Sequence, residues 1–226
     1  MGDIKLIDIK EEVLAEERGL AESIRSRLRA RGLALVNLMS SPGSGKTSLI
    51  LRTVPALRDE FRIAVIEGDI DSAVDAERVA RGGTPAVQIR TGGSCHLSPA
   101  MVEKGLASLP LEALDLIFLE NIGNLICPAE CDTGATLDIA IVSIPEGDDK
   151  PLKYPLVFRM ADAVVVNKTD VADRFDFDTA AFRGTLRRLN PDAPVFEVSC
   201  ATGAGIDTWC DWLRRAAGRA PAATGP

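Results

Sequence analysis

Short apolar runs alternate with amphipathic segments along most of this chain. The runs are rich in Val, Ile and Leu and have the length of strands, while the segments between them have the length of helices. Because the runs are almost continuously apolar, they predict strands that are buried on both faces of a mainly parallel sheet. We expect strands at 33–39, 62–66, 86–89, 114–119, 137–144, 163–166 and 194–198.

The helical segments complete an α/β fold. Ahead of the first strand, Leu14, Leu20, Ile24 and Leu28 recur near helical spacing and predict a helix over about residues 10–31. We therefore expect a helical extension, residues 1–32, packed on an α/β domain of residues 33–217 in which helices flank a mostly parallel sheet. Residues 218–226 are small and rich in Pro and Gly, and we expect a disordered tail. Further helices are expected at 46–58, 75–81, 99–108, 177–189 and 206–217.

Charge and composition narrow the classes of partner. The 226 residues include 26 Lys and Arg against 33 Asp and Glu, a net charge of −7 with no basic run, which argues against nucleic acid. No apolar stretch approaches the length of a membrane span, and the N-terminus is charged where a signal peptide is apolar. Five cysteines without framework spacing indicate reduced thiols. These features predict a cytoplasmic protein that binds neither nucleic acid nor membrane.

The first predicted strand runs into the sequence SSPGSGKT and then into a helix, which is the context of a P-loop. Glycines let successive backbone N–H groups point at phosphate oxygens, and the helix dipole adds to the attraction. Lys46 can neutralise the β- and γ-phosphates, and the Thr47 hydroxyl can ligate Mg²⁺. Ser40 replaces the usual first glycine by another small residue; the alternative is an ordinary Gly-rich turn. The predicted phosphate-binding residues are Gly43, Ser44, Gly45, Lys46, Thr47 and Ser48.

The base is predicted from two later strand ends. The sequence NKTD follows the strand at 163–166 and resembles the guanine-specificity element of GTPases. The Asp170 carboxylate can accept hydrogen bonds from the guanine N1–H and exocyclic amine, which adenine does not present. The alternative is a turn in which Asp170 caps the next helix. The predicted base-binding residues are Asn167, Lys168 and Asp170, with Ser199, Cys200 and Ala201 as a second loop.

Two acidic loops provide candidates for Mg²⁺ and for the attacking water. The first contains Glu67, Gly68 and Asp69 followed by Asp71 and Asp75, and the second is Glu120-Asn121-Ile122-Gly123. We expect Asp69 and Glu120, with Thr47, to hold Mg²⁺, and Asp75 is a second candidate for this ion. The Gly123 N–H is expected to sense the γ-phosphate. The alternative for Asp71 and Asp75 is capping of the following helix. The predicted catalytic residues are Lys46, Asp69, Asp75 and Glu120.

The single histidine, His96, stands next to Cys95, and Cys127 lies just after the second acidic loop. Thiolate and imidazole groups suit Ni²⁺ or Zn²⁺. Adjacent residues cannot chelate as an i,i+4 helical pair does, so Cys95 and His96 need a turn, and Cys127 can approach from the same edge of the sheet. Three soft ligands are few for a closed site, which favours an exchangeable metal or one completed by a second subunit. The alternative is that the cysteines are small buried hydrophobes, as we expect for Cys200 and Cys210.

Several stretches between residues 33 and 205 together resemble, in order, the hydrogenase nickel-incorporation GTPases of the HypB family, which belong to the SIMIBI class of P-loop proteins. The resemblance implies a GTP-hydrolysing metallochaperone that uses GTP, Mg²⁺ and nickel or zinc. It also implies a metal site of Cys95, His96 and Cys127, a GTP-dependent homodimer, a nickel donor called HypA and a hydrogenase large-subunit precursor as client. The stretches are NLMSSPGSGKTSL, VIEGDIDSAVDAERV, PAVQIRTGGSCHL, IFLENIGNLICPAE, EGDDKPLKYPLVFRMAD and VVNKTD.

The sequence departs from some members of that family, because it has no N-terminal Cys-rich motif and no His-rich stretch. Only the site in the GTPase domain is then available for metal. No arginine finger is evident, so intrinsic hydrolysis is expected to be slow. The alternatives are a urease-type nickel accessory GTPase, a GTPase chaperone for a cobalamin-dependent mutase, and a nucleotide-gated switch with structural cysteines.

Overall fold

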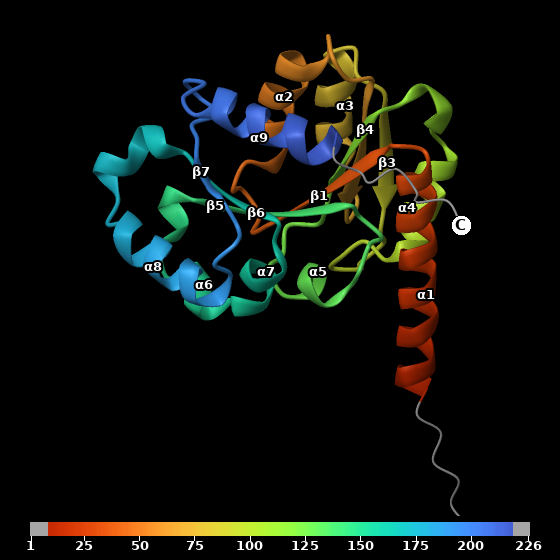
Figure 1. The fold of residues 1–226 in the computed structure, drawn as a ribbon, viewed down its shortest axis with the longest axis horizontal. Coiled ribbons are helices and arrows are strands. Elements are labelled where there is room, and N and C mark those ends of the chain that lie inside the picture. Colours follow the sequence, from red (N-terminus) through yellow and green to blue (C-terminus); the bar gives the residue numbers. More distant parts are fainter. Residues whose placement is uncertain (1–8, 219–226) are drawn as a thin grey trace, which may run out of the picture.

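The computed structural model describes residues 9–218, with side chains from residue 15 onward. A seven-stranded sheet lies between two layers of helices, in the order β3-β2-β4-β1-β5-β6-β7 (Figure 1). Every neighbouring pair of strands is parallel, which confirms the predicted α/β class. The strands are β1 (Ala34–Ser40), β2 (Ile63–Asp69), β3 (Ala86–Arg90), β4 (Leu116–Glu120), β5 (Leu137–Ser143), β6 (Ala163–Asn167) and β7 (Val195–Glu197).

Strand register brings the candidate chemistry together. Strands β1, β2 and β4 are neighbours, and they end at Ser40, Asp69 and Glu120. In the β2–β4 pair Glu67 lies opposite Glu120, so two carboxylates from distant parts of the chain become adjacent. Since ligands of open α/β sheets bind beyond the carboxyl ends of the strands, this edge is where a site is expected.

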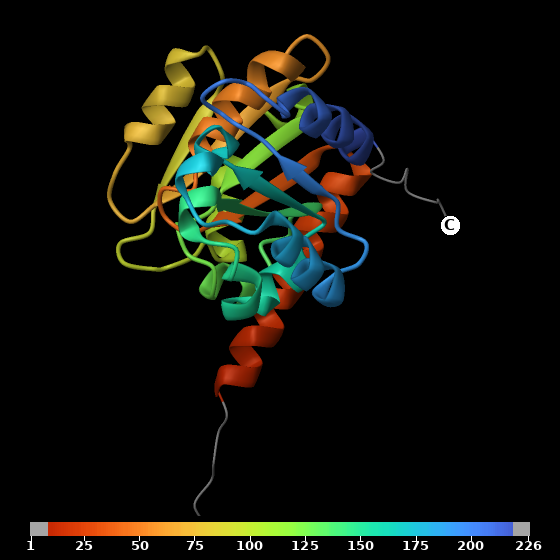
Figure 2. The ribbon, with the colours of Figure 1, turned by 90° about the vertical axis from the view of Figure 1, so that its left-hand side faces the viewer.

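Helices cover both faces of the sheet (Figures 1 and 2). One face carries α2 (Lys46–Leu57), α3 (Val74–Arg81) and α9 (Ile206–Gly218), which share a buried apolar cluster centred on Trp209. Asp178 caps the helix Thr179–Leu189 (α8) by accepting from the Ala181 nitrogen at 2.9 Å, so this helix begins two residues later than the expected 177. The other face carries α1 (Ile9–Ala30), α4 (Pro99–Ala107), α7 (Pro155–Met160) and α8 (Thr179–Leu189), with the short helices α5 (Cys127–Glu130) and α6 (Lys150–Lys153).

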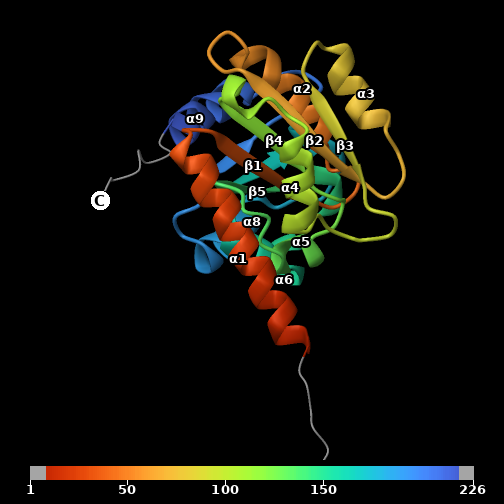
Figure 3. The same cartoon turned by 90° about the vertical axis from the view of Figure 1, so that its right-hand side faces the viewer.

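Helix α1 packs beside α4, and the N-terminal end of α1 extends beyond the sheet (Figure 3). Ile24 and Leu28 are fully buried in the apolar cluster that α1 shares with α4 and the sheet. Ion pairs also hold α1 in place, and one of them joins Arg27 to Glu103 of α4. Residues 1–8 of the expected extension, and the expected tail after Gly218, lie outside the described residues.

Short helices between 111 and 174 were not expected from the sequence. Helices α5, α6 and α7 are four to six residues long, too short to show a helical period. Three 3₁₀ turns are also too short to be predicted from sequence periodicity: Leu111–Ala113, Ile144–Glu146 and Thr169–Arg174. In the part of the chain that the structure describes, no helix is long and apolar enough to cross a membrane.

Candidate functional site

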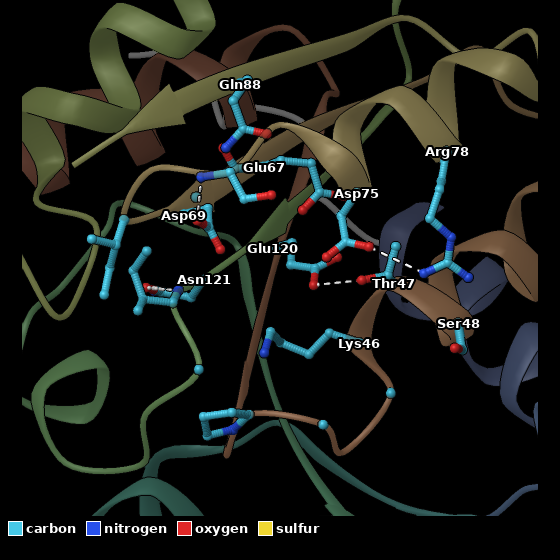
Figure 4. A pocket seen from close by; sticks show the side chains of 18 residues that line it. Lys46, Thr47, Ser48, Glu67, Asp69, Asp75, Arg78, Gln88, Glu120 and Asn121 are labelled. Carbon is cyan, nitrogen blue, oxygen red and sulfur yellow. Dashed lines mark hydrogen bonds and ion pairs between the residues drawn. The ribbon is translucent and has the colours of Figure 1, made fainter. Parts of the chain in front are cut away.

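A cavity of about 480 Å³ opens where β1, β2 and β4 end (Figure 4). It is lined by the P-loop, by both acidic segments and by the first turn of α3. Its size lies within the range of ordinary small-ligand pockets. The predicted phosphate, Mg²⁺ and catalytic residues that line it are Gly43, Gly45, Lys46, Thr47, Ser48, Asp69, Asp75, Glu120 and Gly123.

The P-loop curls between β1 and α2 through left-handed backbone at Gly43 (φ 77°) and Gly45 (φ 101°). A side chain at Gly45 would also collide with the carboxamide of Asn167. The Lys46 ammonium donates to the Ser40 hydroxyl at 3.2 Å, so the serine in place of the usual first glycine gives this lysine a partner. Burial lowers the pKa of Lys46, against the opposing effect of Glu120. A buried cation at the start of a helix is suited to phosphate.

Glu67 and Glu120 form a buried carboxylate pair in the floor of the cavity, being 2% and 6% exposed. The Thr47 hydroxyl donates to Glu120 Oε1 at 2.9 Å, while Glu120 Oε2 and Glu67 Oε1 have no hydrogen-bond partner. Burial, followed by the charge of Glu120, raises the pKa of Glu67 to about 10. Burial raises the pKa of Glu120 as well. Buried carboxylate oxygens without donors fit a hard divalent cation such as Mg²⁺.

Sequence reasoning included Glu67 in the first acidic loop as a candidate carboxylate but favoured Asp69 and Glu120 over it. The available signal was a glutamate inside an otherwise apolar strand, since β2 is buried through Gly68. A charged residue in such a strand is costly unless it is paired or ligates a metal.

Asp69 and Asp75 both reach the cavity but differ in their surroundings. Asp69 Oδ1 accepts from the backbone nitrogens of Asp71 (2.9 Å) and Ser72 (2.7 Å), which leaves its other oxygen for a ligand. Asp75 lies inside the first turn of α3 and pairs with Arg78 at 3.1 Å. No side chain caps this helix, so the capping alternative for Asp71 and Asp75 is wrong. Arg78 also lines the cavity, a cation that sequence reasoning missed.

Gly123 lies against the P-loop. A side chain at this position would come within 2.9 Å of Pro42, so glycine is needed for the approach of the two loops. The close packing places the second acidic loop next to the P-loop backbone, and the sensing role of Gly123 stays a prediction.

Glu146 is a carboxylate that sequence reasoning missed. It ends the 3₁₀ turn after β5 and accepts from the hydroxyls of Ser44 (2.6 Å) and Ser143 (2.8 Å). Burial opposes its charge, but these hydrogen bonds outweigh burial and lower the pKa of Glu146. The ionised carboxylate therefore anchors the P-loop to the end of β5.

The predicted base-binding segments meet at the ends of β6 and β7. Asn167 Nδ2 donates to the Ser44 carbonyl at 2.9 Å, and its Oδ1 accepts from the Cys200 nitrogen at 3.2 Å. Lys168 adopts left-handed backbone (φ 62°), and its ammonium donates to the Gly43 carbonyl at 2.7 Å. The NKTD segment is thus tied both to the P-loop and to the second base loop.

Asp170 is oriented by that second loop. The Ser199 hydroxyl donates to its Oδ1, and Arg52 of α2 holds the carbonyls of Cys200 (2.6 Å) and Ala201 (2.7 Å). The 3₁₀ turn that contains Asp170 has no side-chain cap, so the capping alternative for this residue is also wrong.

Cys95, His96 and Cys127 come together in space. Their candidate ligand atoms all lie within 4.8 Å of one another, with Cys95 exposed and the other two half-buried. Cys95 Sγ is 3.8 Å from His96 Nδ1. A hydrogen bond with the neighbouring Cys127 thiol, followed by burial and the charge of that thiol, raises the pKa of Cys95. A bound soft cation offsets that charge and displaces the protons.

The remaining cysteines lie outside this group. Cys131 directs its thiol to the Leu97 carbonyl at 3.8 Å, and burial raises its pKa to about 12. Cys210 is fully buried in the core under α9, as expected, whereas Cys200 is only half-buried.

Comparison with known proteins decides the family. A family model described as "CobW/HypB/UreG, nucleotide-binding domain" matches residues 34–197. Hydrogenase maturation factor HypB of Azotobacter vinelandii is 45% identical over 214 residues, covering 95% of this chain and 71% of the relative. This chain belongs to the HypB family of hydrogenase maturation factors.

Two further relatives extend the comparison within the HypB family. The crystal structure of HypB from Helicobacter pylori in complex with nickel superposes with a TM-score of 0.86 at 36% identity, covering 93% of this chain and 99% of that one. A Helicobacter hepaticus relative, hydrogenase/urease maturation factor HypB, is 42% identical over 86% of this chain and 81% of its own length. The P-loop fold and the nucleotide-binding family are therefore those that the sequence predicted.

Proposed function

We propose that this HypB-family chain is a GTP-hydrolysing metallochaperone that carries nickel on Cys95, His96 and Cys127 and assists its insertion into the [NiFe]-hydrogenase large subunit. The observation that carries the proposal is the grouping of three soft ligand atoms within 4.8 Å in a domain that also holds a P-loop cavity. The nickel-bound Helicobacter pylori relative, of the same fold, supports nickel as the cargo. Zinc suits the same donors and is a competing ion.

GTP is the proposed nucleotide. Its phosphates would lie on residues 43–48, with Lys46 against the β- and γ-phosphates. Asp170, Asn167 and Lys168 would recognise guanine, with residues 199–201 closing the base site. The serine and arginine that hold this second loop support a preformed guanine pocket.

Mg²⁺ fits the buried oxygens around Thr47. We propose Thr47, Glu120 and Asp69, which line the same cavity, as its ligands. Glu67 is a further candidate, because its Oε1 is buried and has no hydrogen-bond partner. When bound, the ion supplies positive charge that neutralises the phosphates. The burial of this acidic cluster supports a cation as its partner, because uncompensated carboxylates are costly there.

Asp75 and Asp69 are the proposed groups that orient the attacking water. Arg78 is the cation at this end of the cavity besides Lys46, and it is engaged by Asp75. In the structure this arginine is paired with Asp75, and no arginine finger is evident in the sequence, which supports slow intrinsic hydrolysis.

Three ligands are few for a closed metal site, which supports completion of the site by a second copy. The other proposed partners are those that the resemblance to HypB implies. A GTP-dependent homodimer would bring ligands from a second copy, and the nickel donor HypA and the large-subunit precursor would load and unload the site. We place these proteins in the cytoplasm. We propose that the boundary between the N-terminal extension and the GTPase domain lies between residues 32 and 33.

The test is hydrogenase maturation in cells whose own copy of the gene has been deleted. Wild type and the exposed control Lys104→Ala should restore nickel to the large subunit, whereas Cys95→Ala and Lys46→Ala should not. Full nickel content with Cys95→Ala would contradict the proposal.

A second client is favoured by the Helicobacter hepaticus relative, whose name includes urease. Urease-directed delivery would use the same residues. Nickel-loaded protein mixed in turn with urease apoprotein and with the large-subunit precursor separates the two, because only the true client should become nickel-bound.

A further inference from the structure

Leu97 connects the candidate metal ligands to both acidic segments of the nucleotide cavity. It directly follows His96, and its side chain is fully buried. The side chain fills the space above Gly68, where an added Cβ would lie 2.7 to 2.9 Å from its atoms. The Leu97 backbone nitrogen donates to Asn121 Oδ1 at 3.1 Å. One residue therefore touches the β2 segment by packing and the β4 segment by a hydrogen bond.

The Asn121 carboxamide is fully buried, and both its oxygen and its nitrogen have hydrogen-bond partners. Its oxygen accepts from Leu97 and from the Ile122 nitrogen (2.9 Å), and its amide donates to Asn37 Oδ1 at 3.1 Å. Asn37 in turn donates to Asp138 at 2.7 Å. A buried amide with all its partners placed has one favoured orientation, and it cannot turn without breaking several hydrogen bonds.

The same backbone segment faces the nucleotide. Glu120 precedes Asn121 and accepts from Thr47, while Ile122 and Gly123 follow it in the cavity wall (Figure 4). A change in the 120–123 segment on γ-phosphate binding would have to move the Asn121 backbone. Because the Asn121 oxygen holds the Leu97 nitrogen, that movement would reach the residue next to His96.

The metal side has two more contacts with this segment. Asn124 Nδ2 lies 3.4 Å from the Cys95 carbonyl. The Cys131 thiol, on the residue that follows α5, lies 3.8 Å from the Leu97 carbonyl. Both contacts are long or weak, whereas the Asn121–Leu97 hydrogen bond is buried and well formed.

We propose that Asn121 is a positioning residue that transmits the nucleotide state to the Cys95–His96 pair by fixing the backbone of Leu97. This inference rests on the proposed function, whose metal and nucleotide sites it joins. Two ligands that bias the same element are coupled, and the coupling is reciprocal: nickel must change nucleotide affinity by the factor by which nucleotide changes nickel affinity.

The test compares nickel dissociation constants in GDP and in a non-hydrolysable GTP analogue, for wild type, Asn121→Ala and the matched control Asn190→Ala. Asn190 caps the carbonyls of Phe158, Arg159 and Ala161 on the α7–α8 side, so its loss removes a structural carboxamide away from both sites. Wild type and the control should show a ratio of about fivefold or more, a typical allosteric coupling. Asn121→Ala should bring the ratio within about twofold of unity while still binding one equivalent of nickel in each state.

Hydrogen exchange of the Leu97 amide in the wild-type protein adds a readout that needs no variant, and its rate should differ between the two nucleotide states. An unchanged ratio in Asn121→Ala, a wild-type ratio of one, or equal Leu97 exchange in both states would overturn the inference and leave nickel and GTP binding in place. Absence of stoichiometric nickel binding in the wild-type protein would instead remove the proposed function.

Discussion

The hydroxyl of Ser199 donates a hydrogen bond of 2.5 Å to the Asp170 carboxylate, so the loop after β7 orients the residue that is proposed to read the base. The pairing fixes the orientation of the Asp170 carboxylate, whose remaining lone pairs are available to the ligand. Two loops that are far apart in sequence thus form one recognition element, and this relationship makes base specificity open to a direct test.

Asp170→Asn should shift nucleotide preference from GTP to xanthosine triphosphate. Asparagine still accepts from Ser199, but its amide meets the guanine amine donor and complements the xanthine carbonyl instead. Since an unpaired buried polar group costs about 1–3 kcal/mol, GTP affinity should fall by on the order of 100-fold. Titration calorimetry with both nucleotides measures the exchange, with the exposed Asp173→Asn as control. A variant that still prefers GTP would contradict the base assignment.

Glu67→Gln should stabilise the nucleotide-free protein, and increasingly so as the pH rises. The pKa of Glu67 is raised from 4.5 to about 10, because burial disfavours the charged form. Its contribution to folding is therefore complete below about pH 4.5 and is lost as the pH rises toward 10. Glutamine carries no such dependence.

Urea unfolding at pH 5, 6.5 and 8 measures the effect, with the exposed Glu77→Gln on α3 as control. The free energy of unfolding of Glu67→Gln should exceed that of wild type by a margin that grows over this range. Parallel pH profiles for the variant and wild type would show that Glu67 is not held neutral by its surroundings.

Ile24→Ala should destabilise the whole α/β domain and not only helix α1. Ile24 is fully buried against the sheet and the α4 side, and Gly134 packs directly on it. Truncation in a core of this kind costs about 2–5 kcal/mol. Chemical unfolding followed at Trp209, on the opposite face, reports the domain itself, and Ser23→Ala on the exposed side of α1 is the control. A transition at Trp209 that is unchanged would mean that the extension is an independent unit.

The central sheet could be predicted because its strands are continuously apolar, a pattern that surface strands do not show. The P-loop was predicted from glycines and a lysine in their strand–helix context. Helices α5 to α7 could not be, because four to six residues do not show a period. The approach of Glu67 to Glu120 depends on β2 pairing with β4, a non-sequential neighbour that no local pattern specifies.

The metal group illustrates the same limit. The chemistry of Cys95, His96 and Cys127 was readable from residue type, but the spacing left structural cysteines as an alternative. Cys95 and His96 follow β3, Cys127 follows β4, and β2 lies between these two strands in the sheet. The three residues therefore meet because of the paths of the loops, which no local sequence pattern specifies. Cys131, only four residues from Cys127, turns instead toward Leu97.

The measurement that tests the central claim most directly is a titration of Ni²⁺ into the reduced protein, read by thiolate–metal absorbance and molecular mass. It should be run with GDP and with a non-hydrolysable GTP analogue. We predict stoichiometric binding that depends on the nucleotide, is lost in Cys95→Ala and Cys127→Ala, and is retained in Cys210→Ala. Tight GTP binding with no specific nickel binding, or binding that survives loss of both Cys95 and Cys127, would contradict a nickel-carrying function for this site.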